Sequence, residues 1–157
     1  MPNQKPKRLT VNAAFFQEIK EDHKHLRDLI EKLCGLTSNR PALGNHKREF
    51  VTLLAELRDQ LALHFALEEA YGYFEDALEE TPRFHEQADR LRGQHCELYL
   101  LIQQISESAV EVCDLEEPDL LGIADQFEAF NMAFRAHESA ELNLILEALN
   151  LDMGVGD

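Results

Sequence analysis

Histidine and glutamate recur at the same four-residue spacing in two parts of the chain. His64 is followed by Glu68, and His137 is followed by Glu141. Residues four apart share one face of an α-helix, so each pair would present an imidazole and a carboxylate side by side. Imidazole with carboxylate and no thiolate suits iron, manganese or zinc better than copper(I) or calcium. The repeated His-x-x-x-Glu unit therefore predicts metal-binding chemistry.

Two further histidines, His23 and His95, stand in the same kind of position. Each of them interrupts an apolar stripe of helical period, as His64 and His137 also do. An ionised carboxylate buried alone in a helical core is strongly unfavourable, so inward-facing glutamates among imidazoles need a compensating positive charge. A divalent or trivalent metal ion supplies that charge.

The elements that must position these residues are four amphipathic helices, and strand signals are sparse. Gly35 is expected to cap the first helix at its C-terminus, and Pro82 to separate the second from the third. Long helices with short connections predict an all-α, up-down-up-down antiparallel four-helix bundle. The expected helices cover residues 12–34, 45–79, 83–113 and 118–150. The bundle as a whole is expected to span residues 12–152, between a flexible N-terminal tail (1–11) and a C-terminal tail (153–157).

The four histidines should lie at one level of this bundle. Each falls within about three residues of the midpoint of its expected helix, which is about 5 Å of axial rise. Two metal ions about 3.5 to 4 Å apart, bridged by carboxylates, would use every one of the inward-facing ligands. The predicted ligands are His23, His64, Glu68, His95, His137 and Glu141.

Other residues near these motifs have simpler interpretations. A single inward histidine is more often a hydrogen-bonded core residue than a ligand, but four at one level favour a metal site. His25 should point away from the core, His85 lies about 15 Å along its helix from His95, and His46 falls in a connection. Tyr71 could pack in the core or donate a hydrogen bond beside the site, and packing is favoured; Glu138, next to His137, could contact the site and is left open.

The overall composition limits the partners of the chain. Its 30 acidic and 15 basic residues give a formal net charge of -15, which would repel phosphate backbones and acidic membrane surfaces. Nucleic acid and membrane are therefore not expected as partners. Three cysteines without a CxxC spacing predict neither disulfides nor a zinc knuckle, and they favour a reducing cytoplasm. The N-terminus has no apolar signal segment, and no apolar run is long enough to span a bilayer.

Four short segments in order along the chain carry a resemblance to a known family. These segments are Asp22-His23-x-x-Leu26, His64-x-x-x-Glu68-Glu69, Gln94-His95-x-x-Leu98 and His137-x-x-x-Glu141. Together they resemble the hemerythrin-like HHE cation-binding domains, four-helix bundles with a non-heme di-iron site. The resemblance implies that the six predicted ligands hold two iron ions, with Glu68 and Glu141 as the bridging carboxylates.

One position departs from the oxygen-carrying members of that family. They usually have a His-x-x-x-His pair on the third helix, whereas the residue four positions before His95 is Leu91. The chain is therefore more similar to the broader HHE branch, which includes proposed sensors of oxygen, nitric oxide or iron.

Three classes of function follow. The favoured class is a di-iron protein that binds or senses oxygen, nitric oxide or iron, with zinc and manganese as alternative metals. A di-iron carboxylate oxidase or peroxidase is the second class, although ferritin-type sites usually use Glu-x-x-His pairs and more carboxylates. A metal-free helical interaction module is the third, and it would have an unusually polar core. The balance favours a binding protein over an enzyme.

Overall fold

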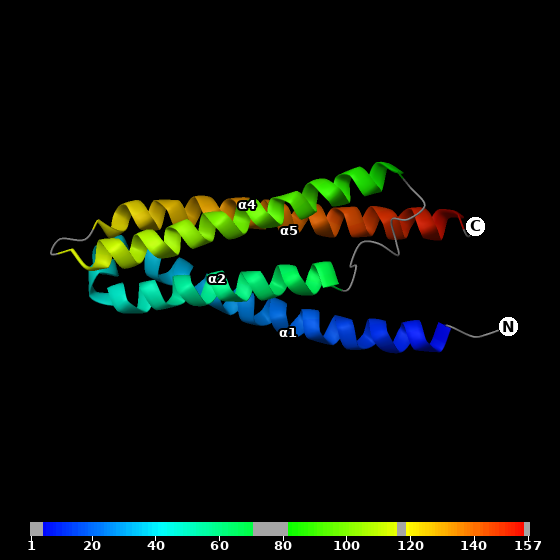
Figure 1. Ribbon diagram of the computed structural model, residues 1–157, viewed down its shortest axis with the longest axis horizontal. Helices are drawn as coiled ribbons and strands as arrows, with labels where there is room; N and C mark the ends of the chain where they lie inside the picture. Colours follow the sequence, from blue (N-terminus) through cyan, green and yellow to red (C-terminus); the bar gives the residue numbers. More distant parts are fainter. Residues whose placement is uncertain (1–4, 71–81, 116–118, 156–157) are drawn as a thin grey trace.

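The computed structural model describes the backbone of residues 5–70, 82–115 and 119–155, and the side chains of residues 21–69, 82–115 and 119–148. Over these residues the chain forms four long α-helices, one short 3-10 helix (η1) and no strand. The elements are α1 (Lys5–Ser38), η1 (Arg40–His46), α2 (Lys47–Ala70), α4 (Pro82–Cys113) and α5 (Leu120–Val155). Consecutive long helices run in opposite directions (Figure 1), so the predicted all-α bundle is confirmed.

The first helix is longer than the sequence pattern predicted. It begins at Lys5 instead of near Asn12, and Pro6 lies in its first turn, where a missing backbone N–H breaks no helical hydrogen bond. Its other end lies beyond Gly35, so the prediction that Gly35 caps the helix is wrong.

Burial of the last turn explains why α1 continues through Gly35. Thr37 is buried and Leu36 packs against the main apolar core, so the helix gains contacts by continuing. The Thr37 hydroxyl donates to the Cys34 carbonyl and the Ser38 hydroxyl donates to the Gly35 carbonyl, which satisfies acceptors near the helix end. These gains exceed the penalty of about 1 kcal/mol for a glycine inside a helix.

The last helix begins at Leu120, two residues after the predicted start near 118, and ends at Val155 instead of 150. The Asp119 side chain accepts a hydrogen bond from the Gly122 backbone N–H at 3.3 Å, which is the geometry of an N-cap. The expected end of the second helix at 79, and Tyr71, lie outside the described residues.

The four helices form a ring with one looser seam. Among the described residues, α1 packs along α2, α2 along α4, and α4 along α5, whereas α1 and α5 touch much less. No helix in the described part of the chain is long and apolar enough to cross a membrane.

The described side chains form two apolar clusters in the interior. The larger runs along all four helices and includes Leu61, Ile102 and Phe134. The smaller lies between the start of α4 and the end of α5, and consists of Phe84, Ala88, Leu91, Leu144 and Ala148. His95 follows Leu91 on α4, and His137 and Glu141 precede Leu144 on α5. A polar layer therefore separates the two clusters.

Candidate metal centre

Five of the six predicted ligands are buried side chains in this polar layer. His64 and Glu68 come from α2, His95 from α4, and His137 and Glu141 from α5; each is 6% exposed or less. The sixth, His23 on α1, is half-buried, and its ring centroid lies 5.0 Å from that of His64. The helices thus bring all six residues to one region of the interior.

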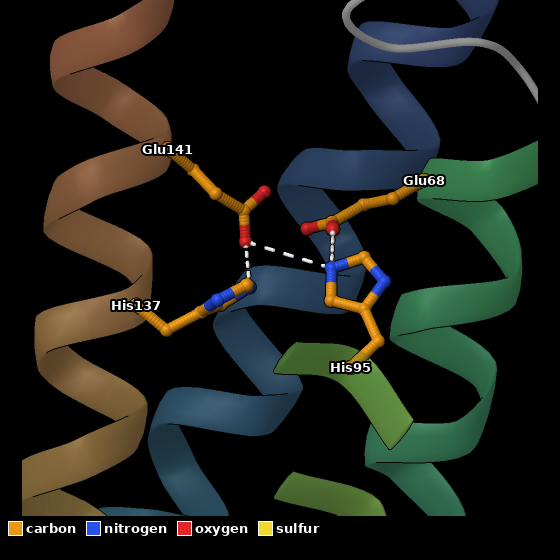
Figure 2. Close-up of side chains that lie close together, drawn as sticks. All are labelled: Glu68, His95, His137 and Glu141. Atoms are coloured by element: carbon orange, nitrogen blue, oxygen red, sulfur yellow. Dashed lines mark ion pairs between the residues drawn. The ribbon is translucent and has the colours of Figure 1, made fainter. Parts of the chain in front are cut away.

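The innermost group consists of Glu68, His95, His137 and Glu141, which point toward one another from three helices (Figure 2). One potential ligand atom from each lies within 4.8 Å of the others. The His95 Nε2 atom is 3.1 Å from Glu68 and 3.8 Å from Glu141, and His137 Nε2 also pairs with Glu141. Four donor atoms therefore surround a single point, as a metal ion would require.

Glu68 reaches histidines of two different helices with its two oxygen atoms. Its Oε1 atom lies 2.8 Å from His64 Nε2, and its Oε2 atom lies 3.1 Å from His95 Nε2. A carboxylate in this arrangement can ligate one ion through each oxygen. The contacts of Glu141 are with His95 and His137, so its geometry supports a ligand on that side of the centre.

Apart from the close His–Glu contacts just described, the atoms that face the interior have no hydrogen-bond partner in the described part of the chain. They are the Nε2 atoms of His64, His95 and His137, Oε2 of Glu68 and Oε1 of Glu141. Buried polar atoms are normally hydrogen-bonded, so imidazole and carboxylate atoms that converge in the interior and contact only one another indicate a site for a cation. Nitrogen and oxygen donors of this kind fit a transition-metal ion.

His64 is held in place from its outer side by Asp22. The Asp22 carboxylate, itself buried, contacts His64 Nδ1, and its other oxygen accepts a hydrogen bond from Gln60 Nε2 at 2.7 Å. With Nδ1 occupied, His64 directs Nε2 to the interior. A carboxylate behind a ligating imidazole fixes the ring and increases its basicity. Asp22, His23 and His64 also form a second potential ligand group, but Asp22 lies on the outer side of the ring.

His95 and His137 are supported in the same way. Glu69 Oε1 lies 3.3 Å from His95 Nδ1, and Gln94 Oε1 lies 2.8 Å from His137 Nδ1. Each supporting residue is next in sequence to a predicted ligand, and it contacts the histidine of the following helix. Asp22, Glu69 and Gln94 belong to the motifs that predicted the site, but the motifs assigned them no role. Their position beside a predicted ligand was the only feature of the sequence that could have indicated their supporting role.

Two phenylalanines form the apolar floor of the centre. The Phe65 ring stacks on the His95 ring, with centroids 4.0 Å apart and an interplanar angle of 9°. The Phe134 ring packs edge-to-face with the His64 ring, and their centroids are 6.2 Å apart. Both phenylalanines belong to the main apolar cluster. Aromatic packing on this side limits rotation of the imidazoles.

The buried charges compensate one another in the metal-free protein. Burial lowers the pKa of His64, but hydrogen bonding to Asp22 and Glu68 outweighs it and raises that pKa to about 10. The pKa of His95 is raised to about 9, because Glu141 and Glu68 outweigh the opposing effect of burial. Burial acts to raise the pKa of Glu68, yet these histidines lower it overall. Protons on imidazoles therefore carry the positive charge that a metal ion would replace.

Glu138 lies beside this centre, on the side of His64. Its Oε1 atom is 3.6 Å from His64 Nε2, and its side chain is 31% exposed. Burial raises the pKa of Glu138 to about 7, partly opposed by the nearby His64. Glu138 is therefore close enough to interact with an ion held by His64.

The residues set aside by the sequence analysis lie away from the centre. His25, His46 and His85 are all exposed, as predicted. The three cysteines are free thiols, and Cys96 beside His95 is exposed. Neither these three histidines nor the cysteines belong to the two potential ligand groups found among the described residues.

The fold and the site together define a helical-bundle protein with a candidate cation-binding centre in its core. The family model of the hemerythrin HHE cation-binding domain matches residues 14–149, and the chain belongs to this family. No curated protein and no solved structure matches the chain.

The first prediction concerns the support that Asp22 gives to His64. Replacing Asp22 with Asn keeps the size of the side chain but removes the charge behind the imidazole. We expect the affinity for a divalent metal to fall about 10- to 100-fold, because the ligand loses basicity and orientation. Competition titration against a coloured chelator measures this. Asp28→Asn, an exposed aspartate of the same helix, is the matched control, and an equal loss in both variants would contradict the assigned role.

The second prediction concerns pH. Because the pKa of His64 in the folded protein is about 10 and its usual value is 6.5, the imidazolium stabilises the folded metal-free chain fully below about pH 6.5. That contribution is lost as the pH rises toward 10. Urea unfolding of chelator-treated protein should show this decrease, and His64→Gln should reduce it. The control His85→Gln, at an exposed position, should leave the decrease unchanged; a pH slope that His64→Gln does not alter would be the contrary result.

Proposed function

We propose that this protein is a non-heme di-iron protein that binds or senses a small diatomic ligand such as oxygen or nitric oxide. The observation that carries the proposal is the convergence of buried imidazole nitrogens and carboxylate oxygens in the polar layer. Six donor residues are more than one ion needs, which favours two ions. Their mixture of imidazole and carboxylate suits iron, with manganese and zinc as alternatives.

The proposed ligands divide between two positions. His95 and His137 would hold one ion, together with Glu141 and one oxygen of Glu68. His23 and His64 would hold the second, with the other oxygen of Glu68. The 2.8 Å and 3.1 Å contacts of Glu68 with His64 and His95 support its role as a bridge. A bridging role for Glu141 is part of the proposal on the basis of its His-x-x-x-Glu spacing.

Protein side chains define what the centre can do. Bound iron would supply reversible one-electron chemistry and open coordination positions for a small ligand. Phe65 and Phe134 pack against the rings of His95 and His64, and the outer partners of His64, His95 and His137 keep their Nε2 atoms aimed inward. Such rigid support limits rearrangement of the ligands when the charge of the centre changes.

The environment of Leu91 argues against a role as an oxygen carrier. Leu91 is buried in the smaller apolar cluster, one turn before His95, where oxygen-carrying relatives have a histidine. Leu91 has no ligand atom, so a centre held by the six proposed residues would keep coordination positions free for exogenous ligands, water or Glu138.

The third prediction tests the di-iron assignment. The protein should contain about two iron ions per chain, and either His64→Ala or His137→Ala should remove both, because Glu68 links the two positions. Elemental analysis with an optical spectrum of the isolated protein measures this. His85→Ala, at an exposed site on α4, should keep its iron. Full metal content in both ligand variants would refute the assignment.

The fourth prediction concerns the reaction with oxygen. We expect anaerobically reduced protein to be oxidised to the di-ferric state on exposure to air, without reversible oxygen uptake. The reason is that Leu91 stands at the position where the oxygen-carrying proteins have a histidine. Cycling between air and vacuum while recording the visible spectrum tests this. An absorption band that disappears under vacuum and returns on every cycle would show that the protein carries oxygen.

A further inference from the structure

A pocket of about 420 Å³ lies at the seam between α1 and α5. Its apolar lining comes from Leu26, Ile30 and Phe134, and His23 and Glu138 also line it. Because His23 contacts His64 and Glu138 approaches His64 Nε2, the pocket connects the surface with one side of the candidate centre. It lies where the ring of helices closes most loosely.

The lining of this pocket is less acidic than the chain as a whole. Arg27 on α1 and Arg135 on α5 both line it, together with the carboxylates of Glu31 and Glu138. The whole chain has a net charge of -15. Neither arginine forms an ion pair of hydrogen-bonding length with a residue that the structure describes. Two guanidinium groups without such partners at a pocket mouth attract anions.

The field of Arg135 extends across the seam to α1. Burial raises the pKa of the Cys34 thiol, the positive charge of Arg135 opposes that effect, and the carboxylates of Glu128 and Glu31 add to it. Cys34 lies one turn beyond Ile30 on α1, and Asn131 of α5 donates a hydrogen bond to its sulfur at 3.5 Å. The guanidinium therefore acts on the space between the two helices.

Glu138 lies where the pocket comes close to the candidate centre. Like Asp22, Glu69 and Gln94, it is adjacent in sequence to a predicted ligand. Those three residues contact the outer Nδ1 atom of a histidine, whereas Glu138 approaches His64 at Nε2, the inward-facing atom. It also lines a second pocket of about 300 Å³ together with Glu68 and Glu141. Its carboxylate thus stands between the pocket and the centre.

We propose that the α1–α5 pocket is an access port for small singly charged anions. Arg27 and Arg135 attract the anion, and the Glu138 carboxylate limits its approach to the metal centre. The port rests on the proposed di-iron function, because the bound metal is the destination of the anion. Anions of this class include azide, nitrite and hydroperoxide. An uncharged ligand such as nitric oxide would gain nothing from the arginines.

The electrostatic contribution should be visible in association rates. A unit charge about 7 Å away in water changes the local concentration of a monovalent anion about threefold, so two arginines give about tenfold. This effect should weaken as salt screens the charges. Glu138 should act in the opposite direction, since its carboxylate repels an anion and competes for the same position.

The test uses azide as the probe and the iron-loaded, di-ferric protein. Stopped-flow absorbance would follow azide association with the double variant Arg27→Gln/Arg135→Gln and with the control Arg48→Gln/Arg90→Gln. The control removes the same charge from exposed positions that do not line this pocket. We expect azide association about five- to tenfold slower in the first variant at low salt, and unchanged in the control. The rate of nitric oxide association with the reduced protein should be the same in both double variants.

A second variant tests the inner end of the port. Glu138→Gln keeps the size of the side chain and should increase azide affinity about tenfold, with the affinity measured on protein whose iron content has been determined. Glu147→Gln, at an exposed position on the same helix, is its control and should leave azide affinity unchanged.

Iron analysis of each variant separates the two proposals. Normal iron content with equal azide rates in the two arginine double variants would overturn the port alone. A wild-type chain that takes up no iron would overturn the di-iron function and the port with it. Slower binding of both azide and nitric oxide in the Arg27/Arg135 variant would show a steric effect and would also overturn the anion port.

Discussion

The arrangement of this bundle depends on the need to neutralise buried carboxylates. Asp22, Glu68 and Glu141 all lie in an interior where an isolated negative charge is strongly unfavourable. In the metal-free chain the imidazolium groups of His64 and His95 meet that need, as their raised pKa values indicate. Protons and metal ions therefore compete for the same donors, so metal affinity is coupled to pH. The polar layer is stabilised by direct contacts between these imidazoles and carboxylates.

The supporting contacts follow a regular pattern around the ring of helices. On α1, the residue next to a predicted ligand contacts the Nδ1 atom of the histidine on α2. The same kind of contact runs from α2 to the histidine of α4 and from α4 to the histidine of α5. At the seam between α5 and α1 the pattern changes, because Glu138 approaches the inner nitrogen of His64 instead. The predicted ligands are consequently supported by such contacts on three sides, and a pocket adjoins them on the fourth. That asymmetry gives the two proposed metal positions different surroundings.

Apolar packing on either side of the polar layer maintains this geometry. The main cluster brings Phe65 and Phe134 against the imidazole rings, and the smaller cluster covers the opposite end around Leu91 and Leu144. A helix shift would disturb both clusters as well as the donors between them. The hemerythrin HHE family match over residues 14–149 covers all of these elements, so the centre and its packing belong to one domain.

The sequence by itself determined the fold class and the inward position of the six predicted ligands. Both follow from local periodicity, since residues at helical spacing share a face whatever surrounds the helix. Sequence reasoning failed at Gly35, where burial of Leu36 and Thr37 overrides the local preference of glycine, a balance that depends on contacts between helices. Only the tertiary structure decided that Asp22, Glu69 and Gln94 support histidines on neighbouring helices, and that Glu138 faces a pocket. These roles depend on how the helices are rotated and packed against one another, which the spacing of residues along one helix cannot specify.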